Sequence, residues 1–375
     1  MKKIIVIGCG FAGLTVAEQL SSFGDILELT VIDKNPYFNF LPSLPDVIGR
    51  DIRPGYLSYP IKILSRKLKF NFIEEQATAV DLRNNTVSTA RQTLKYDYLV
   101  IASGTETNFY GNNEIRQNAY KLDDTKDAGL ILDALQNKNF DHYIISGAGY
   151  TGIEIAVGLR AYLRKRLLDK PVLIVEKGNS LLGPLPEWIK EYTLDNLRRL
   201  DVRVLVNSAV AKVEPEKITL SSQDTFANAM LIWTAGVKTP DFVRNLNVDK
   251  TPQGRLKVDE YLRVNDNCFA AGDSAYFAYK GAALRMAVQF AIMQGISISR
   301  NILRLQRGMW LHKYRPYDLG YIIPMANNKS CGRVLGINVK GVLPTFLHYA
   351  MVVYRSYGFR NKFGIIFGLF RPKHR

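Results

Sequence analysis

The chain has 375 residues, a formal net charge of +16 and 47% hydrophobic residues. This length suits two or three domains, and the hydrophobic content is sufficient for buried cores. The three cysteines are far apart and form no Cys-x-x-Cys pair, which argues against a disulfide framework or a zinc site and fits a reducing compartment. No run of about 18 apolar residues is present, so we expect no membrane-spanning helix.

The first predicted unit opens with an apolar strand near residues 3–7 and the glycine-rich loop GCGFAG at residues 8–13. The loop precedes a helix rich in Ala and Leu, and the next apolar run, LTVID, ends at Asp33. In such a loop the first glycine allows a tight turn, the second lets the backbone approach a pyrophosphate, and the third lets the helix pack closely; the acid accepts hydrogen bonds from ribose hydroxyls. The loop explains the apolar N-terminus better than a signal peptide does, so we expect no export.

Further strands near residues 70–73 and 96–102 extend this unit, with a hairpin-like turn near residue 85 between them. The last strand runs into small residues, among them Ala102 and Gly104. Small side chains allow the strand end to lie against a cofactor or against the glycine loop, and a plain strand exit is the alternative.

The same pattern returns 139 residues after the first loop. A β-branched run precedes GAGYTG at residues 147–152, and the following run, VLIVE, ends at Glu176. A strand near residues 202–207 follows, and a later strand again ends in small residues, Ala235 and Gly236. Two complete units predict two dinucleotides in one protein, an arrangement that suits electron transfer between them. The Glu176 carboxylate would repel a 2′-phosphate, which favours NADH over NADPH.

A third strand end lies in CFAAGDSA, residues 268–275, and carries Asp273. A carboxylate at this point suits hydrogen bonds to the ribityl hydroxyls of a flavin. We expect a helix over residues 282–307, with Gln289 and Gln294 on an otherwise apolar face. Glutamine in an apolar setting needs hydrogen-bond partners, and these are either a cofactor or acceptor headgroup, or the protein backbone.

The last fifth of the chain is strongly basic, with 14 Lys or Arg and one acid. Two aromatic-rich apolar stretches, residues 342–354 and 363–370, are bounded by cations that end with Arg371, Lys373 and Arg375. Each stretch is too short to cross a bilayer and suits its surface, with anionic headgroups held by the cations. A core helix or a dimer interface is the alternative, and no nucleic-acid-binding motif is present.

The order of these motifs resembles the flavoproteins of the pyridine nucleotide-disulfide oxidoreductase family, and within it the type II, non-proton-pumping NADH:quinone oxidoreductases. The subfamily resemblance rests on segment 37–49 (YFNFLPSLPDVIG), on Glu154 two residues beyond the second loop, on helix 287–295 and on the basic tail. The helix departs from the family pattern Ala-Gln-x-Ala-x-Gln-x-Gly, because Met293 replaces the second Gln and offers a quinone less hydrogen bonding. No cysteine pair lies near residues 40–50, so we expect no disulfide relay.

The resemblance implies an α/β fold with two Rossmann-type parallel-sheet domains, the NAD domain inserted in the FAD domain, and a C-terminal amphipathic membrane-associating segment. The expected boundaries are 1–118 and 250–310 for the FAD-binding domain, 119–249 for the NAD-binding domain and 311–375 for the C-terminal segment. It also implies FAD as cofactor, NADH as substrate, menaquinone or ubiquinone as acceptor, and a peripheral location on the cytoplasmic face of the cell membrane. Dimerisation is left open.

The resemblance places Glu154 at the acceptor step or in the nicotinamide pocket, and Gln289 at the quinone or flavin edge. Glu154 is alternatively a helix N-terminal acid favoured by the helix dipole. The residues implied in FAD binding are Gly8, Gly10, Phe11, Ala12, Gly13, Asp33, Lys34, Ala102, Gly104, Gly272 and Asp273. Those implied in NADH binding are Gly147, Gly149, Tyr150, Thr151, Gly152, Glu176 and Gly236.

Two other functions fit the same residues. One is a soluble FAD-dependent NAD(P)H reductase for a ferredoxin-like or other protein acceptor, because a basic surface suits an acidic redox protein. The other is a flavoprotein that senses NADH, turns over slowly and signals through dimerisation.

Overall fold

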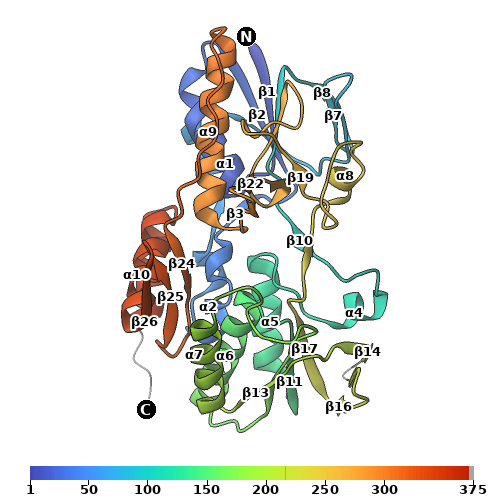
Figure 1. Ribbon diagram of the computed structural model, residues 1–375, viewed down its shortest axis with the longest axis vertical. Helices are drawn as coiled ribbons and strands as arrows, with labels where there is room; N and C mark the ends of the chain where they lie inside the picture. The colour runs from blue at the N-terminus through green and yellow to red at the C-terminus, as the bar shows by residue number, and fades with distance from the viewer. Residues whose placement is uncertain (216, 371–375) are drawn as a thin grey trace. The chain divides into compact units, whose positions relative to one another are not determined.

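The computed structural model describes residues 1–215 and 217–370, which form two compact units (Figure 1). Unit 1 consists of Met1–Phe38, Pro60–Glu106 and Val237–Asp318. Unit 2 consists of Asn39–Tyr59, Thr107–Gly236 and the described residues from Leu319 onward. The three cations predicted to end the basic tail, Arg371, Lys373 and Arg375, lie outside the described residues.

Unit 1 is built on a five-stranded parallel sheet with the order β20-β9-β1-β2-β5. Its strands are β1 (Lys2–Ile7), β2 (Leu27–Asp33), β5 (Asn71–Glu74), β9 (Tyr98–Ile101) and β20 (Cys268–Ala270). The Ile, Val and Leu side chains of the central strands are buried, as near-continuous apolar runs predict for parallel strands covered on both faces. The predicted strands of the first unit are confirmed to within two residues.

Two helices of unit 1 pack together beside this sheet. Helix α1 (Phe11–Leu20) follows β1, and α9 (Val288–Gln306) lies along it (Figure 1). The contact is close because α9 presents Gly295: a Cβ added there would come 2.8 Å from the carbonyl oxygen of Ala12. The far end of the sequence is thereby fixed against the helix that follows the first glycine loop.

The prediction of a helix over residues 282–307 was wrong at its start. Strands β22 (Ala278–Tyr279) and β23 (Ala282–Ala283) form a hairpin, and α9 begins only at Val288. Both residues of the intervening turn, Lys280 and Gly281, have positive φ angles of 51° and 80°. Two consecutive positive φ angles favour a tight β-hairpin, and this pairing overrides the helix propensity of the alanines that follow.

The remaining elements of unit 1 are short. The predicted turn near residue 85 is confirmed by an antiparallel sheet of β6 (Ala79–Asp81), β7 (Thr86–Ser88) and β8 (Thr93–Lys95). The other short segments of unit 1 are η1 (Ser21–Phe23), α3 (Ile61–Leu68), β18 (Val237–Lys238), α8 (Asp241–Arg244), β19 (Leu256–Lys257), η4 (Gly272–Ser274) and β21 (Ala275–Tyr276). The segments η2 (Leu41–Ser43) and η3 (Pro54–Tyr56) belong to unit 2, and β3 (Tyr37–Asn39), β4 (Ser58–Pro60) and β10 (Glu106–Thr107) include residues of both units.

Unit 2 repeats the architecture with a four-stranded parallel sheet in the order β13-β12-β11-β17. Its strands are β11 (His142–Ser146), β12 (Val172–Val175), β13 (Val202–Leu205) and β17 (Ala229–Trp233). Its helices include α4 (Asn113–Asn118), α5 (Thr125–Asn137), α6 (Tyr150–Lys165) and α7 (Glu187–Arg199). An antiparallel sheet, β14 (Val210–Glu214), β15 (Lys217–Leu220) and β16 (Thr225–Ala227), accompanies them. The predicted α/β class with two parallel sheets is confirmed.

Segments from two distant parts of the sequence complete unit 2. Helix α2 (Asp46–Gly49) packs on α6 where two glycines meet: a Cβ at Gly49 would lie 2.7 Å from the Cα of Gly158. The C-terminal part contains the antiparallel sheet β24 (Gly320–Ile323), β25 (Ser330–Val334) and β26 (Ile337–Gly341), followed by α10 (Val342–Arg355) and α11 (Phe359–Phe370). The predicted assignment of FAD-binding, NAD-binding and C-terminal segments stays a prediction.

Candidate dinucleotide sites

The first glycine loop joins β1 to α1, and its three glycines have different surroundings. Gly8 has a φ of +99°, and a Cβ there would come 2.3 Å from the carbonyl oxygen of Ala102. A Cβ at Gly13 would come 1.9 Å from the carbonyl oxygen of Gly8, whereas Gly10 has no atom within 4 Å of such a position. The first and third glycines are therefore required by packing, and the second leaves open space for an approaching group.

The second loop, between β11 and α6, has the same geometry. Gly147 has a φ of +106°, and a Cβ there would come 2.9 Å from the carbonyl oxygen of Thr234. A Cβ at Gly152 would come 2.0 Å from the Gly147 carbonyl oxygen, and Gly149 again faces open space. In both loops the second glycine is the N-cap of the helix and has no side-chain cap, so the first N–H groups of α1 and α6 suit the oxygens of a pyrophosphate.

The acids that follow each loop hold the loop backbone. Asp33 accepts hydrogen bonds from the N–H groups of Cys9 (2.7 Å) and Asn35 (2.8 Å). Glu176 accepts from Ala148 and Gly178, each at 2.7 Å. Each carboxylate oxygen has two acceptor sites, so each acid can still accept from ribose hydroxyls. The sequence indicated the ribose role but gave no sign that the same acids shape the loops.

The small residues at the strand ends lie against the glycine loops, one of the two positions expected for them. Ala102 contacts Gly8 in unit 1, and Thr234 contacts Gly147 in unit 2. Thr234 also donates its hydroxyl hydrogen to the carbonyl of Ser146 at 2.8 Å. Gly104 and Gly236 both have positive φ angles, and the space a Cβ would need at Gly236 is filled by the hydroxyl of Tyr110.

The other predicted cofactor residues at the loops occupy the first turns of the helices or the next strand end. The ring of Phe11 meets that of Phe38 edge-on at 5.1 Å, and the ring of Tyr150 meets that of Tyr321 at 6.3 Å. Thr151 is exposed. Lys34 lies 3.8 Å from Glu106, an exposed ion pair that contributes little stability.

The Gly-Asp turn after β20 lies beside the first loop. A Cβ at Gly272 would come 3.3 Å from the Cβ of Ala12, and the Gly272 N–H donates to the side-chain oxygen of Gln294 at 2.7 Å. Gln294 therefore bonds to the protein backbone, which was one of the two kinds of partner expected from the sequence. Among the described residues, the Asp273 carboxylate has no hydrogen-bond partner; burial raises its pKa and the nearby Arg255 lowers it.

Gln289 is held by its own unit. Its side-chain nitrogen donates to Asp318 at 3.0 Å, and Arg285 donates to both carboxylate oxygens of Asp318 at 2.6 and 2.7 Å. A bidentate guanidinium pair of this kind fixes the carboxylate, and through it the Gln289 amide. The predicted contact of Gln289 with an acceptor stays a prediction.

Glu154 is the fifth residue of α6, just beyond its first turn. Burial raises its pKa well above the ordinary value, with Asp46 of α2 adding a like charge. Asp46 is itself buried and accepts a hydrogen bond from the hydroxyl of Tyr349 on α10. The guanidinium of Arg50 stacks 4.6 Å from the Tyr349 ring. Sequence reasoning missed this group, because its members come from three separate segments of the chain, with Asp46 and Tyr349 303 residues apart, and share no motif.

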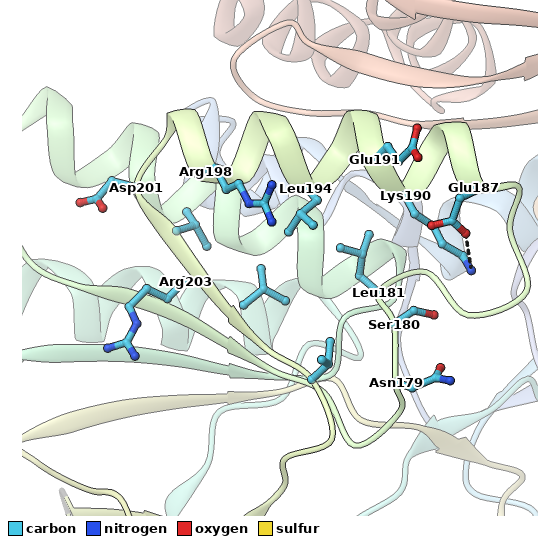
Figure 2. Close-up of a pocket in the computed structure, with 13 residues that line it drawn as sticks. Asn179, Ser180, Leu181, Glu187, Lys190, Glu191, Leu194, Arg198, Asp201 and Arg203 are labelled. Atoms are coloured by element: carbon cyan, nitrogen blue, oxygen red, sulfur yellow. Dashed lines mark ion pairs between the residues drawn. The ribbon is translucent and has the colours of Figure 1, made fainter.

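One groove of unit 2 lies between α7 and β13, the strand at the sheet edge, with a cavity volume of about 630 Å³ (Figure 2). Figure 2 shows the ion pair between Glu187 and Lys190, whose charged atoms are 3.4 Å apart, at one end of it. The lining includes Asn179 and Ser180, shortly after Glu176, but neither Glu176 nor the glycine loop. The groove is thus separate from the predicted pyrophosphate site.

The family model described as pyridine nucleotide-disulphide oxidoreductase matches residues 2–295. The chain belongs to this family. The three cysteines are buried and none is in a disulfide. The match also spans both glycine loops and the Gly-Asp turn, and it confirms the resemblance drawn from their order.

Named relatives are more distant. The type II NADH:quinone oxidoreductase of Staphylococcus aureus is 23% identical, over 92% of this chain and 93% of its own length. The external alternative NAD(P)H-ubiquinone oxidoreductase B3 of Arabidopsis thaliana is 24% identical over 73% of this chain, which spans 54% of that relative. The structure of NDH2 from Plasmodium falciparum in complex with NADH superposes with a TM-score of 0.86 at 18% identity and covers both chains completely. That likeness establishes the shared fold.

Proposed function

We propose that the protein is an FAD-dependent oxidoreductase that takes a hydride from NADH and passes the electrons to a membrane quinone. The observation that carries the proposal is the pair of glycine loops, whose first and third glycines are closed by packing and whose second glycine is open in both units. The names of the relatives from Staphylococcus aureus and Arabidopsis thaliana, both quinone or ubiquinone oxidoreductases, support the choice of acceptor.

FAD is assigned to unit 1 because that loop is completed by a second polar strand end. The open Gly10 and the N-terminus of α1 suit the pyrophosphate, Asp33 suits the ribose, and the unpaired carboxylate of Asp273 suits the ribityl hydroxyls. When bound, FAD supplies the electron-accepting chemistry, and the protein provides binding and orientation.

NADH is assigned to unit 2 through Gly149, the N-terminus of α6 and Glu176. The negatively charged side chain of Glu176 accepts the backbone N–H groups of Ala148 and Gly178, and its oxygens have further acceptor sites for a ribose hydroxyl. A 2′-phosphate at this position would meet that charge, so the site favours NADH.

The quinone is assigned to a membrane surface through α10 and α11. Phe359, Phe363 and Phe367 recur every four residues along α11 and are 82%, 57% and 69% exposed. Helix α10 likewise exposes an apolar face that includes Phe346 and Tyr354. Among the described residues, no helix is both long and apolar enough to cross a membrane. An aromatic face beside Arg355, Arg360 and Lys362 suits insertion among anionic headgroups.

An acceptor screen tests the proposed function. The purified protein should be yellow, and anaerobic NADH should bleach its flavin absorbance. Rapid mixing of the reduced protein with a menaquinone or ubiquinone analogue should restore the absorbance faster than mixing with a ferredoxin. A colourless protein would refute the proposal, and preferential reoxidation by the ferredoxin would support a reductase for a protein acceptor instead.

A further inference from the structure

Arg255 is a buried cation that joins two separate segments of unit 1. It precedes β19, which pairs in parallel with β21, the strand that follows the Gly-Asp turn. Its Nε donates to the carbonyl oxygen of Asp273 at 3.2 Å, and its Nη2 donates to that of Ala275 at 2.6 Å. Only 8% of the residue is exposed. The guanidinium therefore ties the backbone of the turn to the segment before β19.

The charge of Arg255 is unusual for a residue with a purely structural role. Its bonds within the described residues go to main-chain carbonyls, and no described carboxylate forms an ion pair with it. Burial lowers the pKa of Arg255, and the negative charge of Asp273 raises it. A buried charge without a direct ionic partner costs free energy. Since a neutral side chain could fill the same space at less cost, we expect the charge to serve the turn that it contacts.

The turn is also held on either side of Asp273. The N–H of Gly272 donates to the side-chain oxygen of Gln294 at 2.7 Å. The Ser274 hydroxyl donates to the carbonyl of Gly104, just beyond β9, at 3.3 Å. Among the described residues the Asp273 carboxylate accepts no hydrogen bond. The backbone of the turn is thus fixed, and the carboxylate is available to a ligand.

The sign of the charge matters as well as the two hydrogen bonds. Burial raises the pKa of Asp273, and the positive charge of Arg255 lowers it. An ionised carboxyl accepts hydrogen bonds at both oxygens, whereas a protonated one carries a donor. The ribityl chain of a flavin offers hydroxyl groups as donors, so a cation near Asp273 favours the form that binds them.

We propose that Arg255 is a positioning residue of the flavin site, which holds the Gly-Asp turn in the shape that presents the Asp273 carboxylate to the ribityl hydroxyls. The proposal rests on the proposed function, in which unit 1 binds FAD. It requires no contact between Arg255 and the cofactor, because the guanidinium acts through the backbone of the turn. Replacing Arg255 should therefore weaken FAD binding and leave electron transfer in the FAD-loaded protein intact.

Arg255→Lys tests the proposal. Lysine keeps the charge, but its compact ammonium lacks the planar fork that reaches two carbonyl oxygens at once. The dissociation constant of FAD should rise about tenfold, because hydrogen bonds from a charged donor contribute strongly. It is measured on the full-length protein by the flavin fluorescence released on dilution. With excess FAD, the kcat for NADH–ferricyanide should return to the wild-type value.

Arg160→Lys is the matched control. Arg160 is buried in unit 2 and also donates to two backbone carbonyls, those of Leu200 at 2.7 Å and Lys170 at 2.9 Å. Both substitutions remove the same kind of bond, so both should lower the Tm. Only Arg255→Lys should raise the dissociation constant of FAD, which separates a general loss of stability from a defect in the flavin site.

Thr251→Val keeps the test decisive if Arg255→Lys does not fold. The Thr251 hydroxyl accepts the backbone N–H of Arg255 at 3.2 Å. Valine has nearly the same shape and lacks this acceptor, so the segment that carries Arg255 should be held less firmly. The dissociation constant of FAD should rise about two- to threefold, as the loss of one neutral hydrogen bond allows.

Equal FAD dissociation constants in Arg255→Lys, Arg160→Lys and the wild type would overturn the inference and leave the oxidoreductase function intact. If Arg255→Lys does not fold, an unchanged constant in Thr251→Val overturns it. A kcat of Arg255→Lys that stays low at saturating FAD would also contradict a positioning role. A wild-type protein that binds no FAD would refute the proposed function, and this inference with it.

Discussion

The second and third glycines of the second loop are predicted to have different roles, and replacing each by alanine tests the two roles separately. In Gly152→Ala the new Cβ would lie 2.0 Å from the Gly147 carbonyl oxygen, whereas ordinary contacts begin at 3.4 Å, so one group must move by 1.4 Å. The Gly147 N–H is bonded to the Val175 carbonyl at 2.8 Å, which leaves the loop little freedom to move. Overpacking of this size costs about 3 kcal/mol. For a domain of about 200 residues, the expected fall in Tm is about 6–12 °C.

Gly149→Ala is the matched counterpart. Gly149 has a φ of −77° and a ψ of −172°, which alanine adopts, and its Cβ would meet no atom within 4 Å. Stability should therefore stay within about 0.5 kcal/mol of the wild type. The methyl group would occupy the space left for the pyrophosphate, so the KM for NADH should rise about tenfold, equivalent to about 1.4 kcal/mol.

Thermal unfolding followed by circular dichroism, together with NADH–ferricyanide kinetics, measures both effects. Gly152→Ala should lower the Tm without a primary defect in NADH binding. Gly149→Ala should weaken NADH binding without lowering the Tm. Equal melting of Gly152→Ala and the wild type would refute the packing argument. An unchanged KM in Gly149→Ala would refute the assignment of this loop to NADH.

Glu176→Gln should raise the KM for NADH and improve the use of NADPH, because it removes the charge that opposes a 2′-phosphate. Glu187→Gln, at an exposed acid paired with Lys190, serves as the control. An unaltered NADH/NADPH ratio in Glu176→Gln would contradict the assignment. Replacing Phe363 and Phe367 by Ser should reduce flotation of the protein with phosphatidylglycerol-containing vesicles. Leu130→Ser, at a lone residue of α5 that is 60% exposed, is the control and should not reduce flotation. Undiminished flotation of the double variant would reject the lipid contact, and would favour a dimer interface if the wild type is dimeric. Asp46 has a folded pKa of about 6 against an ordinary 3.8, so its stabilising contribution is complete below pH 3.8 and is lost as the pH rises through 6. The free energy of unfolding of Asp46→Asn relative to the wild type should therefore increase by about 3 kcal/mol between pH 3 and pH 7, measured by urea unfolding, and a constant difference would contradict the raised pKa.

Local patterns predicted much of the fold. Each glycine loop, with its strand, helix and acid, occupies about 30 consecutive residues, and all of its requirements are expressed within that length. The clash of a Cβ at Gly13 with the Gly8 carbonyl oxygen, for example, involves residues five apart. The helix start near residue 282 failed because alanines there favour a helix locally, while pairing with Ala278 and Tyr279 decides the outcome.

The candidate site was predicted less completely, because tertiary contacts rather than local sequence patterns decide which groups its side chains bond to. Asp33 and Glu176 were identified as acids of the right type at the right distance from the loops, but their hydrogen bonds to the loop backbone appeared only in the structure. Gln294 was recognised as needing a partner, and the structure supplied the N–H of Gly272. A sequence identifies which polar groups need partners more readily than it identifies those partners.

The sequence by itself determined that two dinucleotide-binding units share one chain, because the steric rules of each glycine loop act between near neighbours. Only the tertiary structure decided which groups surround Glu154. Asp46 and Tyr349 are 303 residues apart, and their hydrogen bond depends on α2 packing on α6 and on α10 joining the same unit. Such contacts follow from the way helices bury their faces, and burial, rather than any motif, sets the protonation of the acids that meet there.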